Sequence, residues 1–262
     1  MNLLKSKVHY KNAILSFVLL TLTYSSFSQK KDSTNNIFHF KGAVTVTNKG
    51  ISLVPTFTLG KPAAIFDLSL GKKKLFLEPQ LKFSLRGKPW AIIFWLRYKL
   101  IANKKFAFTI GTHPALNFRT DSFLVNGIKK GFLVTRRYLS GELVPNYFVS
   151  KNISVGLYYL YSRGLDNGTI HNGHFLTFNS SFSNINLGSQ FFARFTPQVY
   201  YLNQDGKDGF YLTSSLTVAK KNFPLSLQSL FNKTIRTNVP GSQNFIWNAS
   251  LIYSFNKNYV AR

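Results

Sequence analysis

Charged side chains and one histidine recur at alternate positions of otherwise apolar segments. In chain order they are Glu78, Lys82, Arg86, Arg97, Lys99, His113, Arg119, Arg136, Glu142 and Arg194. Because successive side chains of a β-strand point to opposite faces, this spacing puts the charged groups on one face of extended chain. Basic groups outnumber acidic ones, so the sequence predicts a positively charged face that attracts anions.

Histidine and serine side chains are the candidates for covalent catalysis. The bases would be His113, His171 and His174, and the nucleophiles would be Ser162, Ser180 and Ser181. Such catalysis requires the base within hydrogen-bond reach of the nucleophile and a third group that orients the base. No motif in the chain fixes that geometry. We therefore assign no catalytic residue and expect a non-enzymatic protein, with a lipid-active enzyme as the alternative.

Metal and cofactor sites have weaker support. His171 and His174 have no convergent carboxylate or cysteine that would complete a metal sphere. Asp166-Asn167-Gly168 and Asp205-Gly206 have the composition of turns, which explains them without calcium. The chain contains no nucleotide-binding glycine motif. We expect no metal and no cofactor.

The segment Leu75–Arg86 shows the structural pattern that positions these residues. Its apolar residues except Phe76 share one parity with Pro79, and its polar residues share the other. The same alternation recurs along almost the whole chain. Since every backbone polar group needs a partner inside a membrane, the pattern predicts a closed antiparallel transmembrane β-barrel with lipid outside and a polar lumen. The charged residues above, from Glu78 to Arg194, would then line that lumen.

The number of strands is predicted less directly. Thirteen segments show alternation, among them the short segment Ile51–Leu59, whereas bacterial barrels have an even number of strands. Either the segment 37–47 lies outside the barrel wall or one short segment does not span. A strand with its share of the connections needs roughly 18–20 residues, so the barrel 37–255 has about twelve strands, with ten to fourteen possible.

The connections fall into two groups. Short, lysine-rich turns are expected at 71–73, 103–105, 150–152 and 220–224, and longer polar loops at 120–130, 163–173, 203–209 and 235–242. Outer-membrane barrels have short periplasmic turns and longer outer loops, so the lysine-rich turns are expected in the periplasm. Five prolines, Pro55, Pro79, Pro114, Pro145 and Pro197, fall inside predicted strands. Because proline lacks the ladder donor, we expect β-bulges there or misplaced strand boundaries.

The N-terminus resembles a secretory signal. Lys5, Lys7 and Lys11 precede an apolar stretch over residues 13–24, and Ser26-Phe27-Ser28 offers a cleavage site before Gln29. A polar lead, 29–36, would follow, and residues 256–262 would form a C-terminal tail. No later stretch is long and apolar enough for a membrane helix. The absence of cysteine excludes disulfides, and 26 Phe with 13 Tyr fits aromatic girdles at a membrane surface.

The formal net charge of +25 raises the alternative of nucleic-acid binding. The basic residues are scattered among turns and one strand face, and no nucleic-acid motif is present, so we do not expect nucleic acid as a partner. Lysines in turns facing an anionic membrane surface explain the charge. The expected partners are outer-membrane lipid and lipopolysaccharide, the barrel-assembly machinery, and small anions.

The cleavage site Ser28-Gln29, the turns Gly60–Ala63 and Gly87–Trp90, and the aromatic last strand Phe245–Phe255 carry a resemblance. The chain resembles the small outer-membrane β-barrels of Bacteroidetes-type gram-negative bacteria. The resemblance implies an outer-membrane location and assembly through the aromatic end of the last strand, Phe255, although Asn256–Arg262 continue beyond it.

Barrels of this class include pores, lipid enzymes, adhesins and structural barrels, so the fold does not select one function. We expect a small pore or binding barrel with a positive, porin-like lumen. The alternatives are an acyl hydrolase or acyltransferase, and an interaction barrel acting through its loops. The lumen itself has two possible forms: a plug of ion pairs around Glu78 and Glu142, or an open path lined by arginine.

Overall fold

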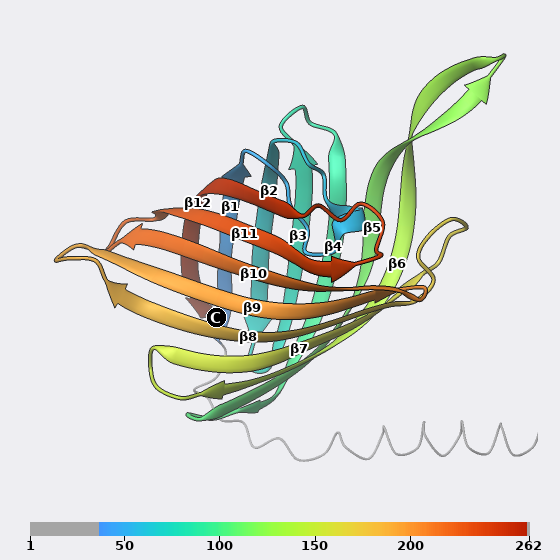
Figure 1. Ribbon diagram of the computed structural model, residues 1–262. Helices are drawn as coiled ribbons and strands as arrows, with labels where there is room; N and C mark the ends of the chain where they lie inside the picture. The colour runs from blue at the N-terminus through green and yellow to red at the C-terminus, as the bar shows by residue number, and fades with distance from the viewer. Residues whose placement is uncertain (1–36, 261–262) are drawn as a thin grey trace, which may run out of the picture. The chain divides into compact units, whose positions relative to one another are not determined.

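The computed structural model describes residues 37–260, which form a closed barrel of twelve antiparallel strands and one short 3-10 helix (Figure 1). The strands are β1 (Ile37–Thr47), β2 (Ala63–Lys72), β3 (Leu75–Ser84), β4 (Pro89–Ala102), β5 (Phe106–Val125), β6 (Ile128–Phe148), β7 (Ile153–Gly164), β8 (Gly173–Asn186), β9 (Phe191–Gln204), β10 (Lys207–Lys220), β11 (Leu225–Thr237) and β12 (Phe245–Val260). The helix η2 (Pro55–Phe57) lies between β1 and β2. No helix in the described range is long and apolar enough to cross a membrane.

Each strand pairs with its neighbour in the sequence, and β1 closes the barrel against β12. That last pairing runs from Ile37 opposite Val260 to Thr47 opposite Ser250. Closure leaves no free edge in the wall, so every strand has partners on both sides. The prediction of an all-β antiparallel barrel with about twelve strands is confirmed, and the segment 37–47 belongs to the wall as β1.

The thirteenth predicted strand, Ile51–Leu59, is wrong. Residues 48–62 leave the wall after β1, and their middle forms η2, which lies inside the mouth of the barrel in Figure 1. Pro55 begins this helix and the backbone N–H of Thr58 donates to the Pro55 carbonyl. All of residues 51–59 are half-buried, and the adjacent Leu53 and Val54 both pack against buried residues of the wall, so the alternation in the sequence corresponds neither to a strand nor to alternate burial.

The outer surface of the wall is apolar. Large side chains on the outward parity are between one third and three quarters exposed, including Leu77, Phe94, Leu139, Phe178, Leu212 and Leu251. A continuous apolar surface of this extent would drive association in water. Transfer of such surface into lipid is favourable by about 25 cal/mol per Å², so the surface fits a lipid bilayer.

β5 and β6 form a hairpin that extends past the other strands at one end of the barrel (Figure 1, upper right). Their pairing continues to Val125 opposite Ile128, and the turn is Asn126-Gly127 with φ of 51° and 77°. The expectation of a loop over 120–130 is therefore wrong, because Asn-Gly is the preferred pair for a two-residue hairpin turn. The expected loop over 203–209 is likewise a two-residue turn, Asp205-Gly206.

The remaining connections follow the predicted asymmetry. Both described chain ends lie at the same end of the barrel as the turns after β2, β4, β6, β8 and β10. All four predicted lysine-rich turns lie at this end, which we call the turn end. The inward segment 48–62, the β5–β6 hairpin and the loops 165–172 and 238–244 lie at the opposite end, which we call the loop end.

Four of the five prolines do lie in strands, but without the expected bulges. At Pro79, Pro114, Pro145 and Pro197 the pairing with one neighbouring strand stops for two residues and resumes in the same register. The missing donor is therefore absorbed by a local gap in the ladder, and the register shifts of the barrel lie at other positions. The fifth, Pro55, lies outside the strands.

The ends of the chain differ from expectation at one position. β12 continues five residues past Phe255, because β1 begins at Ile37 and offers backbone partners as far as Val260. The tail predicted to begin at residue 256 is therefore mostly strand. The predicted signal peptide 1–28 and polar lead 29–36 lie outside the described residues.

Candidate functional site

A cluster of three ionised side chains lies across the middle of the lumen. The Arg97 guanidinium donates from Nε to Glu142 Oε1 at 2.5 Å and from Nη2 to Glu142 Oε2 at 3.1 Å. Its Nη1 donates to Glu78 Oε2 at 2.5 Å. The Glu142 side chain has no exposed surface, whereas the Arg97 and Glu78 side chains are 28% and 21% exposed. We call these three residues the Arg97 cluster.

The strand register explains how the Arg97 cluster forms. Arg97 on β4 is opposite Gly111 on β5, and Gly111 is opposite Glu142 on β6. A Cβ atom at Gly111 would lie 2.6 Å from Glu142 Oε1 and 3.1 Å from Arg97 Cγ. The missing side chain therefore leaves the space through which Arg97 reaches across β5 to Glu142. Ser69 supports the second carboxylate by donating to Glu78 Oε1 at 2.8 Å.

Aromatic rings stack on the Arg97 cluster on its loop-end side. The Arg97 guanidinium lies over the Trp95 ring at 4.2 Å, and the Trp95 and His113 ring centroids are 3.8 Å apart. His113 is 5% exposed, and neither of its ring nitrogens has a hydrogen-bond partner among the described residues. The rings of Trp95 and His113 therefore cover the Arg97 cluster on the side that faces the loop end of the barrel.

The inward segment 48–62 is tied to the wall by hydrogen bonds from side chains of several strands. Trp90 Nε1 donates to the Phe57 carbonyl at 2.8 Å, and the Tyr200 hydroxyl donates to the Leu53 carbonyl at 2.9 Å. Thr56 interacts with Gln204, and its carbonyl accepts from Arg119 at 3.1 Å. These contacts satisfy backbone groups that a buried loop would otherwise leave unpaired.

A buried aromatic cluster supports the same segment from β8, β9 and β10. Tyr200 and Tyr211 are both 1% exposed, and their rings stack with centroids 4.7 Å apart. Asn232 donates to the Tyr200 hydroxyl at 2.9 Å, and Leu53 packs against the cluster. One side of the lumen is therefore filled with side chains, and the cavities lie mainly along β3 to β6.

Three cavities follow one another along that wall. At the loop end a cavity of about 740 Å³ lies between the inward segment and the strands around Arg119. It shares Phe57, Trp90 and Asn117 with a smaller middle cavity of about 170 Å³. The middle cavity shares Trp95 with a cavity of about 760 Å³ that contains Lys41, Glu78 and Arg97. We call these the loop-end, middle and turn-end cavities.

The structure brings together three of the ten residues predicted to line the lumen, Glu78, Arg97 and Glu142, and places the other seven outside this cluster. Lys82 lines the middle cavity, with its Nζ 5.2 Å from the Trp90 ring centroid, and His113 lines the same cavity. Arg119 binds the inward segment, and Arg136 pairs with Asp121 at 2.7 Å. Arg194 is exposed and pairs in register with Thr217 near the turn end.

Arg86 lies outside the strands. It lies in the turn 85–88, beyond the end of β3 at Ser84, and is exposed beside the loop-end cavity. The predicted strand was extended to Arg86 because its polar side chain continues the alternation. An arginine before a glycine is also common in turns, so the sequence did not mark the end of the strand.

Several interior residues have no counterpart in the sequence prediction. Trp95 and Gly111 have the inward parity, but their roles depend on which residues lie opposite them on neighbouring strands. Asp121 was assigned to a loop, and Tyr200 and Phe57 gain their role through contacts across the barrel. The sequence offered one signal for Trp95, Gly111 and Tyr200, namely that each lies at an inward-facing position of its predicted strand.

The histidines do not form a catalytic pair. His113 is opposite Ser140 in the register, yet the Ser140 hydroxyl donates to Ser162 at 2.9 Å. His174 Nδ1 is hydrogen-bonded to the Tyr159 hydroxyl at 2.9 Å. Within residues 37–260, no group of three histidine, cysteine or acidic residues could hold a metal ion.

One loop at the loop end is fixed by an ion pair. Arg137 donates to Asp166 through both Nε and Nη2, and the Arg137 backbone N–H donates to the same carboxylate at 2.6 Å. These hydrogen bonds hold the pKa of the Asp166 carboxyl below its usual range. They attach the loop 165–172 to β6.

Comparisons with known proteins agree with this architecture. No family model matches the chain, and no curated protein matches it. The solved KdgM porin matches with a TM-score of 0.51 at 11% identity over 82% of this chain and 99% of that chain. The NanC porin gives 0.47 at 11% identity over 84% and 100%, and an outer-membrane channel from Pseudomonas putida F1 gives 0.43 at 11% over 87% and 100%. The chain has the fold of an outer-membrane, porin-like β-barrel.

Proposed function

We propose that this protein is an outer-membrane pore for small solutes, with a path that follows the wall from β3 to β6. The observation that carries the proposal is the succession of three cavities through the barrel, which share lining residues at their contacts. The path narrows at the contact of Phe57 with Trp90 and at Trp95. The inward segment at the first narrowing forms a gate.

The charge of the path favours anions at its turn end. Lys41 lines the turn-end cavity, Lys99 lies over the Phe76 ring, and Arg194 is exposed on the inward parity of β9. None of the three has an ion pair within the described residues. A surplus of unpaired cations raises the local concentration of anions in a water-filled passage.

The proposal extends to location and partners. The chain is secreted through its N-terminal signal and inserted in the outer membrane by the barrel-assembly machinery, with outer-membrane phospholipid and lipopolysaccharide around it. The turn end faces the periplasm, where its lysine-rich turns contact anionic headgroups. The apolar belt of the outer surface supports the lipid environment.

Single-channel recording in planar bilayers tests the pore. We expect a small conductance for the unaltered barrel and a larger one for Trp90→Ala, which opens the narrowing at Phe57. Trp247→Ala is the matched control, since Trp247 is 48% exposed on the outer surface. Reversal potentials in a salt gradient should show an anion preference. Silence of both the unaltered barrel and Trp90→Ala would contradict the pore.

A further inference from the structure

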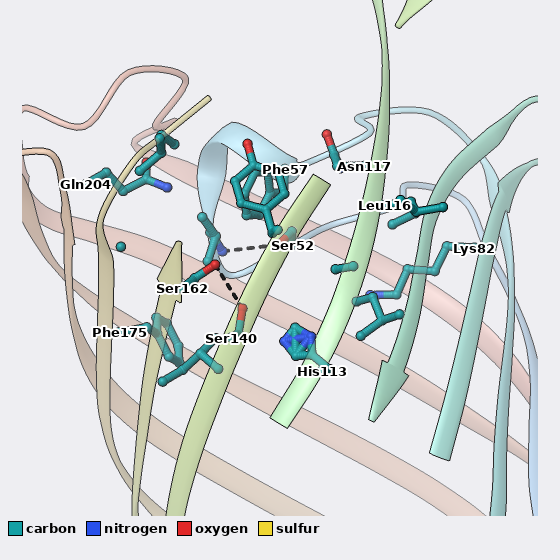
Figure 2. Close-up of a pocket in the computed structure, with 18 of the residues that line it drawn as sticks. Ser52, Phe57, Lys82, His113, Leu116, Asn117, Ser140, Ser162, Phe175 and Gln204 are labelled. Atoms are coloured by element: carbon teal, nitrogen blue, oxygen red, sulfur yellow. Dashed lines mark hydrogen bonds between the residues drawn. The ribbon is translucent and has the colours of Figure 1, made fainter. Parts of the chain in front are cut away.

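The middle cavity has the construction of a ligand site. It is a partly open cavity beside the inward segment, and side chains from β3 to β9 line it (Figure 2). Its body is apolar, with Ile93, Ala115, Leu160 and Phe175 in the wall. The volume of about 170 Å³ is close to that of cavities in protein cores of about 150 Å³ that bind benzene. The cavity therefore accommodates a molecule with the size of one ring.

Two buried polar groups at this cavity have no partner in the protein. His113 is 5% exposed with both ring nitrogens unpaired, and Asn117 is 6% exposed with its Oδ1 unpaired. Leaving a buried polar atom without a hydrogen bond is unfavourable, and most such atoms in folded proteins are bonded to protein, water or ligand. Both residues line the middle cavity, so their missing partners belong inside it. The N–H of His113 needs an acceptor, whereas Asn117 Oδ1 needs a donor such as water.

The charge of the cavity selects the kind of partner. Lys82 reaches the cavity from β3, on the opposite side from Ser140 and Ser162 in Figure 2. Lys82 has a cation–π contact with Trp90 and no ion pair within residues 37–260. The carboxylate of Asp67 on β2 attracts it from a distance and accepts a hydrogen bond from Gln80. None of the described residues lining the cavity is acidic. A half-buried ammonium group in these surroundings favours an anion.

We propose that the middle cavity binds a small monocarboxylate whose apolar body has the size of one ring. The carboxylate pairs with the Lys82 ammonium group and accepts a hydrogen bond from the N–H of His113. The apolar body lies against Ile93, Ala115 and Leu160. The inference deepens the proposed function by naming a class of solute for the path, and it rests on that function only for the route by which the solute reaches the cavity.

Benzoate is the probe, and tryptophan fluorescence is the readout. The chain has three tryptophans, of which Trp90 and Trp95 line the cavity and Trp247 lies on the outer surface. A Trp247→Phe background therefore makes the emission a report on the cavity. Titration of the refolded barrel in detergent with benzoate should give a saturable change. Benzamide, which has the same ring and no charge, should bind roughly ten- to a hundredfold more weakly, since a charge-assisted hydrogen bond is lost.

Two variants test the assigned contacts. Lys82→Met, which keeps the length of the side chain, should weaken benzoate binding by a similar factor and remove the preference over benzamide. Lys233→Met is the matched control, because Lys233 is exposed on β11 and lines none of the three cavities, and its binding of benzoate should be unchanged. Ala115→Leu should fill the cavity and abolish binding of both probes. If Ala115→Leu does not fold, the comparison of the two lysine variants still decides whether Lys82 binds the carboxylate.

The possible outcomes separate this inference from the proposed pore. No saturable change with benzoate would overturn it, and the cavity would then hold water alone. Equal binding of benzoate and benzamide, or an unchanged affinity in Lys82→Met, would overturn the assignment of a carboxylate. Benzoate binding by a barrel that conducts no current would refute the pore and support the ligand site. Conductance without benzoate binding would support the pore and refute the ligand site.

Discussion

Removing the cation of the Arg97 cluster should destabilise the barrel strongly. Arg97→Met keeps most of the side-chain length but leaves Glu78 and Glu142 facing the lumen without their shared partner. Three hydrogen bonds to carboxylate oxygens are lost, and Glu142 has no exposed surface through which water would replace them. Loss of one partner of a buried ion pair costs about 3–5 kcal/mol. Because Glu78 is partly hydrated, we expect a loss near the lower end, about 3 kcal/mol.

Urea unfolding of the barrel reconstituted in lipid vesicles measures this loss, with folded and unfolded fractions separated by their mobility in cold SDS gels. Arg136→Met is the matched control. Its partner Asp121 is 31% exposed near the loop end, so the control should lose about 1 kcal/mol or less. Adding Glu142→Gln to Arg97→Met should recover part of the stability, because the buried charge is removed. Equal losses for Arg97→Met and Arg136→Met would refute the reasoning.

Three further changes test single contacts. Gly111→Ala should lower the free energy of unfolding in the same urea assay by about 1–2 kcal/mol, because the added Cβ displaces Glu142 from Arg97. Gly141→Ala is the control and should have little effect, since the closest atom to its added Cβ is 3.9 Å away. Tyr200→Phe removes the hydroxyl that binds the inward segment and should increase current noise, while an unchanged trace would show that the segment is held by other contacts. In an NMR pH titration, Asp166 should titrate below its ordinary pKa of about 3.9. In Arg137→Met the pKa should rise only part of the way back, because the backbone N–H of residue 137 still donates to the carboxylate. The attachment of the loop is complete above pH of about 3.9 and is lost as the pH falls through the lowered pKa.

Alternation along the sequence was sufficient for the wall of the barrel but not for its contents. The inward parity of Glu78, Arg97 and Glu142 follows from a period of two, and a carboxylate in a narrow lumen must find a cation. Which cation it finds depends on the register between β4, β5 and β6, and on the absence of a side chain at Gly111. Register between distant strands has no local signal in a single sequence.

Two of the errors of assignment have different causes. The hairpin turn Asn126-Gly127 had a recognisable signal, which was outweighed by the polar residues around it. The segment 51–59 alternates in sequence as a strand does, yet all of its residues are half-buried, and the adjacent Leu53 and Val54 both pack against the aromatic cluster that contains Tyr200. A period of two in the sequence is therefore compatible with a segment that lies inside the barrel without alternate burial.

In a chain of net charge +25, the few acidic residues inside the barrel pair with arginines in the middle of the lumen and near its loop end. Glu78 and Glu142 enclose Arg97 in the middle, and Asp121 neutralises Arg136 near the loop end. Glu142 is covered completely, so the exposed charges of the Arg97 cluster are one guanidinium and one carboxylate. An anion preference must therefore originate at the unpaired cations of the turn end and at Lys82, and neutralising Arg97 should change stability more than selectivity.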